Sequence, residues 1–283
     1  MTPCFWGSVN QWECDENDHL NVRYYAHKVQ QAVQIFLARP GHPAQGLADR
    51  VAAMHIRFLA EARSATPLRV DCGVVDGDGT LLALVHQNIS GDVLAAFVLT
   101  LQRAEPTLPP EQALVAVPDF AEPRGIVPDA MPLPPDGLTA ALQAGYQIVG
   151  RGVIGADECD ASDHVLPHGY IGRISDGMPN LWAFMNADAE RAARATGALG
   201  GAALEQRLVM HRPLMRGSIY TQLSGVRSLG NKTQHMSHLI YDHVRDAFAA
   251  SADAVGVAMD LSTRRAVPIS AERRARLEPL LLR

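Results

Sequence analysis

The sequence predicts an α+β protein in which one chain carries two copies of the same fold. Three observations predict it: an acidic motif that occurs twice, a proline-rich stretch that divides the chain, and a helix-forming pattern followed by strand-forming segments. Internal repetition constrains the architecture first, because a repeat marks a structural unit that is used more than once.

The repeated motif contains acidic residues, a cysteine and a histidine. Its two copies are Glu13-Cys14-Asp15-Glu16-Asn17-Asp18-His19 and Glu158-Cys159-Asp160-Ala161-Ser162-Asp163-His164. Two further pairs keep the same spacing, namely Gly7 with Gly152 and Tyr25 with Tyr170. Packing alone rarely needs such an ionisable cluster twice, so the motif is a candidate for chemistry.

Composition describes a globular protein of ordinary size. The 283 residues leave room for two domains, and 47% of them are hydrophobic while 19% are charged. The net charge is −5 and the basic residues are dispersed, which does not indicate nucleic-acid binding. The densest basic run, Arg273-Arg274-Ala275-Arg276, is expected to be the solvated face of a terminal helix.

Targeting and cofactor signals are lacking in the sequence. The segment Met1–Asp15 does not resemble a secretory leader, and no apolar run approaches the roughly eighteen residues of a membrane span. The four cysteines form no CxxC pair, so we expect reduced thiols in a cytoplasmic protein. Without a G-x-S-x-G, Walker or G-x-G-x-x-G motif, neither a serine hydrolase nor a nucleotide cofactor is indicated, and we expect no cofactor.

Proline marks the expected division of the chain. Nine of the eighteen prolines lie between Ala104 and Gly137. Proline breaks helices and cannot donate to a sheet ladder, so this stretch is expected to be an extended connector. We therefore expect a first unit at 1–104, a connector at 105–137 and a second unit at 138–283.

The first unit reads as a long helix followed by an antiparallel meander. Apolar residues recur at helical spacing from Val22 to Leu37, with Asn21 as the N-cap and Pro40-Gly41 as the end. Strands are expected at His55–Ala62, Leu68–Val75, Leu81–Ile89 and Val93–Arg103, with a turn at Asp76-Gly77-Asp78-Gly79.

The second unit repeats this order with local divergence. Its expected strands are Leu208–Met215, Ser218–Val226, Gln234–Tyr241 and Ala254–Leu261. Gly73 with Gly225 and His86 with His238 align at a second common spacing, so the two histidines are expected at equivalent strand positions. After the second motif, a helix interrupted by Gly169, Gly172, Gly177 and Pro179 is expected, and 197–201 reads as a flexible turn.

The segment Trp12–Tyr25 resembles the opening motif of hotdog-fold acyl-CoA thioesterases, which reads approximately D-x-x-G-H-x-N-x-x-x-Y. Asp15, His19, Asn21 and Tyr25 occupy the matching positions, and Asp18 stands where the family usually has Gly. In the second half Asp160, His164 and Tyr170 match, whereas Leu166 replaces the Asn. Because the resemblance covers both halves, it implies a tandem (double) hotdog fold, in which each antiparallel sheet wraps a long helix, as in the 4-hydroxybenzoyl-CoA thioesterase-like family.

The resemblance also implies a function. It predicts an acyl-CoA thioesterase that releases free acid and coenzyme A, with Asp15 or Asp160 as general base or nucleophile. His19, Asn21, Tyr25 and His164 would bind the substrate, and amides at a helix N-terminus could stabilise the oxyanion. Asp15 is favoured over Asp160 because its copy keeps the Asn and the more regular helix. Further assembly of the intrachain pair into a homo-oligomer is compatible with this family.

Several alternatives stay open at this stage. The acidic residues could only cap the helix and order its entry loop. An enoyl-thioester hydratase or dehydratase of the same fold and a non-catalytic acyl-thioester-binding protein are the competing functions. A metal site is not expected, because neither copy supplies enough ligands at an established spacing. Cys14 and Cys159 are less favoured as nucleophiles, and His86 and His238 read as hydrogen-bonded sheet histidines.

Overall fold

The computed structural model describes residues 1–38, 50–76, 79–102, 114–186 and 188–283. Its strands are β1 Thr2–Ser8, β2 Val51–Phe58, β3 Pro67–Val74, β4 Thr80–Gln87, β5 Val93–Leu101, β6 Gln147–Val153, β7 Leu199–Met210, β8 Ile219–Leu229, β9 Thr233–Asp242, β10 Ala247–Asp260 and β11 Arg265–Ala266. Its α-helices are α1 Val22–Leu37, α2 Gly137–Gln143, α3 Pro167–Met185, α4 Asp188–Ala195 and α5 Ala271–Leu277. Within these ranges no helix is long and apolar enough to span a bilayer.

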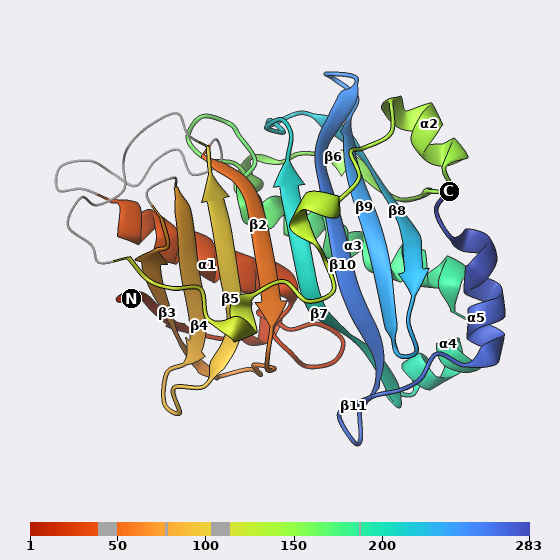
Figure 1. The fold of residues 1–283 in the computed structure, drawn as a ribbon, viewed down its shortest axis with the longest axis horizontal. Coiled ribbons are helices and arrows are strands. Elements are labelled where there is room, and N and C mark those ends of the chain that lie inside the picture. The colour runs from red at the N-terminus through yellow and green to blue at the C-terminus, as the bar shows by residue number, and fades with distance from the viewer. Residues whose placement is uncertain (39–49, 77–78, 103–113, 187) are drawn as a thin grey trace.

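The strands form one antiparallel sheet with a repeated order. The order is β1-β3-β4-β5-β2-β7-β10-β9-β8-β6, so each half presents the same sequence of strands outward from the centre. At the centre β2 pairs with β7 from Ala53 opposite Val209 to Arg57 opposite Glu205. Helices α1 and α3 lie side by side on one face of this sheet (Figure 1). The predicted tandem hotdog fold is therefore confirmed.

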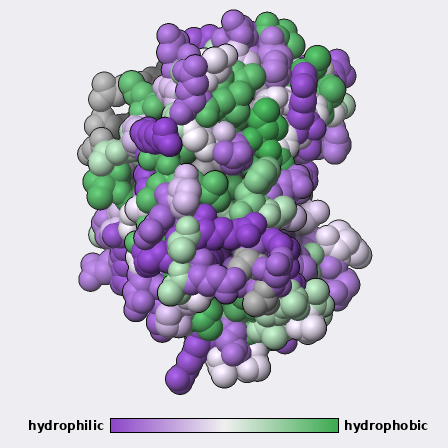
Figure 2. Space-filling model, turned by 90° about the vertical axis from the view of Figure 1, so that its right-hand side faces the viewer, coloured by the Kyte–Doolittle hydropathy of each residue, from purple (hydrophilic) through white to green (hydrophobic). Residues whose placement is uncertain are grey.

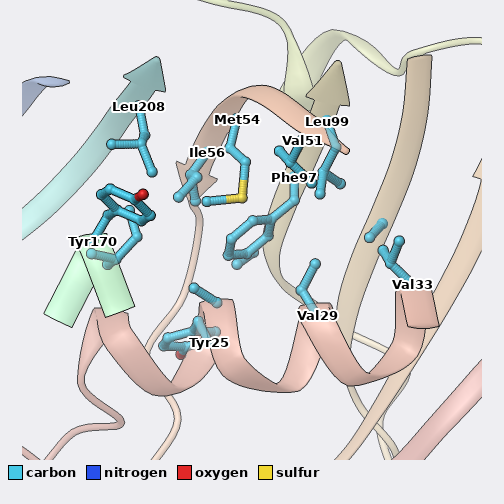
Figure 3. Packing of buried hydrophobic residues seen from close by; sticks show 14 of the residues in the cluster. Tyr25, Val29, Val33, Val51, Met54, Ile56, Phe97, Leu99, Tyr170 and Leu208 are labelled. Atoms are coloured by element: carbon cyan, nitrogen blue, oxygen red, sulfur yellow. The ribbon is translucent and has the colours of Figure 1, made fainter. Parts of the chain in front are cut away.

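The core of the first half lies between α1 and its strands. Tyr25, Val29 and Val33 of α1 point towards Met54, Phe97 and Leu99 of the sheet (Figure 3), and all of these side chains are buried. Their four-residue spacing on α1 is part of the periodicity from which the helix was predicted. Asn21 is the N-cap, as expected, because its side chain accepts a hydrogen bond from the Arg23 N–H. The expected stop at Pro40-Gly41 lies outside the described residues.

The expected interruption of the second helix is wrong. α3 runs without a break from Pro167 to Met185 and has Pro179 in its interior. Its glycines serve close packing: a Cβ at Gly172 would lie 2.8 Å from Cδ of Arg23, and one at Gly177 would lie 2.4 Å from Nε2 of Gln222. Contacts with α1 and the sheet thus outweigh the weak helix propensity of these residues.

Two further expectations about the second half need correction. β7 begins at Leu199 rather than Leu208, so Gly200 and Gly201 belong to a strand and not to a flexible turn. β7 continues through this stretch because the stretch pairs with β10, although its residues are not β-branched. Arg273 is not solvated, because it lies buried in α5 and donates to Glu190 at 3.0 Å and to Gln234 at 2.9 Å.

The free edges of the sheet are β1 and β6. β6 exposes Ile148 and Val153, and the neighbouring β8 exposes Ile219. The side of the molecule that carries α2 and α5 shows apolar side chains interspersed with polar ones (Figure 2). Alternation of this kind is usual for the surface of a globular protein.

The described part of the connector, residues 114–137, crosses the sheet face opposite α1 and α3 (Figure 1). It is held there by Glu205 of β7, whose carboxylate accepts backbone N–H bonds from Arg124 at 3.0 Å, Gly125 at 2.7 Å and Ile126 at 3.2 Å. Nε2 of His55 lies 3.2 Å from the same carboxylate. Burial opposes ionisation of Glu205, but these hydrogen bonds outweigh it and lower its pKa to about 2.

Replacing Glu205 should change how stability depends on pH. Its folded-state pKa of about 2 lies below the ordinary value of 4.5. The resulting stabilisation, about 3 kcal/mol, is present above pH 4.5 and is lost as the pH falls towards 2. We expect Glu205→Gln to reduce the free energy of unfolding at pH 7 by about this amount. The difference between variant and wild type should shrink towards pH 2.5 in urea denaturation, and a difference that is constant with pH would contradict this role.

Candidate active site

The two copies of the motif fold into the same loop. Oδ1 of Asp15 accepts the N–H groups of Asn17 at 2.9 Å and His19 at 3.2 Å. In the second copy, Oδ1 of Asp160 accepts those of Ser162 at 2.8 Å and His164 at 3.1 Å. One carboxylate oxygen of each Asp therefore closes its loop, which leaves only the other oxygen for chemistry.

The departure from the family's Gly is tolerated by the loop. Asp18 and Asp163 both adopt a φ of 61°, a left-handed conformation that usually favours glycine. Aspartate is one of the few other residues that enter this region readily. Both copies thus adopt, at this position, a backbone conformation that glycine enters readily.

The glutamate of each motif anchors the following helix. Glu13 forms a buried ion pair with Lys28 of α1, with both carboxylate oxygens 2.9 Å from Nζ. Glu158 pairs in the same way with Arg173 of α3 and also with Arg23 of α1, at 3.2 Å. This part of the repeat is explained by anchoring of the helix and needs no catalytic role.

The motif cysteines are not activated thiols. Sγ of Cys14 lies 3.6 Å from the Asn10 carbonyl and Sγ of Cys159 lies 3.3 Å from that of Gly155, as hydrogen-bond donors. Burial and neighbouring carboxylates raise the pKa of both thiols. A raised pKa disfavours the thiolate, which is the nucleophilic form.

A cavity of about 410 Å³ lies between the first motif and the sheet of the second half. From the first half it is lined by Asp15, Glu16, Asn17, Asn21 and Val22. The rest of the lining comes from α3, α4, β7, β9, β10 and α5, and it includes Ile174, Met178, Trp182, Gln206, His238, Ala254 and Arg273. Its volume lies in the range of small-molecule sites.

Contacts between the halves place the first motif at this cavity. Nδ2 of Asn17 donates to the Gly201 carbonyl of β7 at 3.4 Å. The approach is so close that a Cβ at Gly200 would lie 2.4 Å from Oδ1 of Asn17. Nδ2 of Asn21 lies 3.0 Å from Oγ of Ser175 on α3. The loop of one half thus forms a wall of the cavity in the other.

The two aspartates differ in their surroundings. Asp15 lines the cavity, and its Oδ2 has no hydrogen-bond partner in the described parts of the chain. Asp160 does not line this cavity, and its Oδ2 is buried, also without a partner among the described residues. The helix that follows Asp160 starts with Pro167, which has no N–H to offer a ligand, whereas α1 starts with Val22.

The side chains that fill the core differ in size between the two halves, and this explains why the cavity lies beside the second half of the sheet. Strand pairing matches Met54, Phe97 and Leu99 of the first half to Gln206, Ala252 and Ala254 of the second. The large side chains of the first half fill its core (Figure 3), and the alanines of the second leave space. This signal was present in the sequence but required the strand register to be read.

The other predicted site residues lie away from the cavity wall. Oη of Tyr25 accepts the Ala62 N–H at 3.2 Å, and Oη of Tyr170 accepts the Leu214 N–H at 2.8 Å, so both tyrosines tie their helices to the backbone. Nε2 of His19 lies 2.6 Å from Nη1 of Arg264 and 3.0 Å from Glu61.

The two motif histidines differ in their environment. Burial lowers the pKa of His19, which favours the neutral ring. His164 is part-buried and forms a backbone bridge with Met215. Neither ring lines the cavity, so a role of either histidine in substrate binding stays a prediction.

The expected equivalence of His86 and His238 is wrong. Cys72 faces Ala83 in the first half, whereas the matching Ser224 faces His238 in the second. The hairpin between these strands is longer in the second half, so His238 corresponds to Ala83. His86 instead lies 3.4 Å from Asp71, whereas His238 belongs to the cavity lining that sequence reasoning missed.

Comparisons with known proteins agree with this fold. Residues 9–112 match the family model described as "Thioesterase-like superfamily", and no curated protein sequence matches the chain. A putative oleoyl thioesterase from Lactobacillus plantarum covers 89% of this chain and 94% of its own, at 12% identity and a TM-score of 0.57. The 12:0-ACP thioesterase from Umbellularia californica covers 89% of this chain and 92% of its own, at 13% identity and a TM-score of 0.57.

A third solved structure is similar over the same extent. An acyl-ACP thioesterase from Bacteroides thetaiotaomicron covers 89% of this chain and 96% of its own, at 12% identity and a TM-score of 0.57. At such identities these likenesses show the fold alone. The family match supports thioester hydrolysis as the class of reaction, and the resemblance predicted from Trp12–Tyr25 is confirmed.

Removing one member of the Glu13–Lys28 pair should destabilise the protein strongly. In Glu13→Ala the buried ammonium of Lys28 loses its partner, which typically costs about 3–5 kcal/mol. Replacing both residues, as Glu13→Leu with Lys28→Met, removes the charge as well, and should recover most of that loss. Urea denaturation measures the free energy of unfolding of the single and the double variant. Equal destabilisation by the single and double variants would show that the pair does not act as a unit.

Proposed function

We propose that the protein is a thioesterase that hydrolyses an acyl-CoA to free acid and coenzyme A, with Asp15 as general base or nucleophile. The observation that carries the proposal is the position of Asp15. It lines the cavity between the halves, and its Oδ2 is not used by the loop. A carboxylate in a largely apolar cavity beside a helix N-terminus suits attack on a thioester carbonyl.

The reaction needs a nucleophile and a site for the developing negative charge. Oδ2 of Asp15 either removes a proton from water as the water adds to the carbonyl, or attacks directly to form a mixed anhydride that water then opens. In both routes the carbon–sulfur bond breaks and the thiolate of coenzyme A takes up a proton. The positive end of the α1 dipole, with the N–H of Val22 at its first position, would stabilise the oxyanion.

Asn21 has a positioning role in this proposal. Its Oδ1 accepts the Arg23 N–H at 2.9 Å and its amide contacts Ser175, so both ends of the side chain are engaged. It therefore fixes the first turn of α1 against α3 beside Asp15. Leu166, the N-cap of α3, makes no side-chain capping bond, so the second copy lacks this device.

Asp160 is assigned a structural role in the proposal. Its Oδ1 closes the second loop as Asp15 closes the first. The first-half core opposite it is filled by Phe97, Leu99 and Met54. At the matching positions of the second half, Ala252, Ala254 and Gln206 take the place of these large side chains.

The acyl carrier is part of the proposal. Coenzyme A is favoured by the resemblance of the Trp12–Tyr25 motif to acyl-CoA thioesterases, whereas two of the solved structures are described as acting on acyl-ACP. Both carriers present a thioester at the end of a flexible arm. An activity screen should therefore include an acyl-ACP beside the acyl-CoAs.

Substitution of the two aspartates separates the roles assigned to them. We expect Asp15→Asn to lower kcat by about 10²–10⁴, because the amide cannot act as a base or nucleophile while its oxygen still accepts the loop N–H bonds. We expect Asp160→Asn, the matched control, to change kcat less than about threefold. Release of coenzyme A is followed with a thiol reagent across a panel of acyl chain lengths. Equal or reversed effects would refute the assignment, and no release from any acyl thioester by the wild type would refute the function.

A further inference from the structure

The cavity wall has polar side chains at positions where the first half has apolar ones. Strand pairing matches Met54 to Gln206 and Ala83 to His238. Met54 and Ala83 lie in the buried core of the first half. Gln206 and His238 are equally buried but line the cavity. The second half has therefore placed two hydrogen-bonding side chains where its counterpart packs apolar groups.

Burial without a partner is unfavourable for such groups. Nε2 of His238 is buried without a partner among the described residues. Gln206 is a buried residue of the cavity wall, and no described side chain hydrogen-bonds to its amide. An unsatisfied buried polar group typically costs more than the hydrogen bond it would make contributes. One such group, together with the Gln206 amide on the wall of the same cavity, points to a ligand with polar atoms of its own.

The orientation of His238 follows from its one hydrogen bond. Nδ1 lies 2.7 Å from Oγ of Ser224 on β8. Nε2 is buried without a partner among the described residues, and the β10 residue opposite His238 is Ala252, two residues from Ala254 of the cavity lining. Ser224 stands where the first half has Cys72, and His238 stands where it has Ala83. The histidine and its hydroxyl partner therefore both occur only in the second half.

The same bond links the proton on His238 to the Ser224 hydroxyl. Burial lowers the pKa of His238 to about 4, so the ring is neutral near pH 7 and has one N–H. The hydrogen bond between Ser224 and Nδ1 fits either neutral tautomer of the ring. When Ser224 donates to Nδ1, Nε2 carries the proton and can donate to a ligand oxygen. When Ser224 accepts from Nδ1, Nε2 can accept from a ligand hydroxyl.

We propose that His238 and Gln206 recognise a hydroxyl or keto oxygen on the acyl chain, so that the preferred substrate is an oxygenated aliphatic acyl thioester. Nε2 of His238 and the Gln206 amide each donate to that oxygen or accept from a hydroxyl. Ile174, Met178 and Met236 supply the apolar wall for the carbon chain. This inference rests on the proposed function for the reaction, but the recognition itself requires only binding.

The two residues act as specificity-determining residues, since neither is placed at the thioester. A site that hydrogen-bonds a substrate hydroxyl discriminates strongly against an analogue without it, because its own polar groups are then left unpaired. A saturated chain would leave both His238 and Gln206 unsatisfied. Selection should therefore appear as a difference between matched acyl groups, and not as a general loss of turnover.

The experiment compares decanoyl-CoA with its 3-, 6- and 10-hydroxy analogues. The variants are His238→Ala and Gln206→Met, each of which introduces the residue found at the matching position of the first half. Thermal melting checks that both variants fold. For the wild type we expect kcat/KM to be at least about tenfold higher for one hydroxylated analogue than for decanoyl-CoA. For His238→Ala we expect that preference to fall to less than about threefold.

Calorimetry with the free acids separates this inference from the proposed function. If no acyl-CoA is hydrolysed but a hydroxydecanoic acid binds the wild type at least tenfold more tightly than decanoic acid, and His238→Ala abolishes the difference, the inference stands and the proposed function fails. If the acyl-CoAs are hydrolysed without preference for any hydroxylated chain, the inference is overturned and the function stands. Equal loss of both substrates in His238→Ala, or the absence of any binding preference, also overturns the inference.

Discussion

The pairing of β2 with β7 is the constraint on which the rest of the structure depends. It joins the two halves into one sheet and sets α1 against α3 on one face of it. The loop that carries Asp15 then meets the first residues of β7, through Asn17 and Gly201. A candidate site made of a loop from one half and a cavity from the other can form only because these two strands pair.

The two halves keep the same scaffold and differ in what fills it. The anchoring ion pairs at Glu13 and Glu158 and the tyrosine hydroxyls that hold the neighbouring backbone occur in both. In contrast, Phe97 and Leu99 of the first core correspond to Ala252 and Ala254 of the second. Loss of large side chains normally destabilises a core by leaving a cavity. The second half retains such a cavity, and the first half supplies the carboxylate that faces it.

Local patterns predicted much of the fold. The helix at Val22–Leu37 and its Asn21 cap could be read from periodicity and capping chemistry, because both depend on neighbouring residues. α3 could not, since Gly172 and Gly177 look like interruptions until Arg23 and Gln222 pack against them. Arg273 likewise reads as a solvated residue until Glu190 and Gln234 surround it in the folded protein.

The sequence by itself determined that the fold is duplicated, that each copy has an acidic loop before a helix, and that both loops have the same shape. The shared shape of the two loops follows from short-range hydrogen bonds within the motif, such as those accepted by Asp15 and Asp160. Only the tertiary structure decided that Asp15 faces a cavity and that His238 lines it. The physical reason is strand register: side chains alternate between the two faces of a sheet, so a few extra hairpin residues place His238 on the inner face while His86 lies beside Asp71.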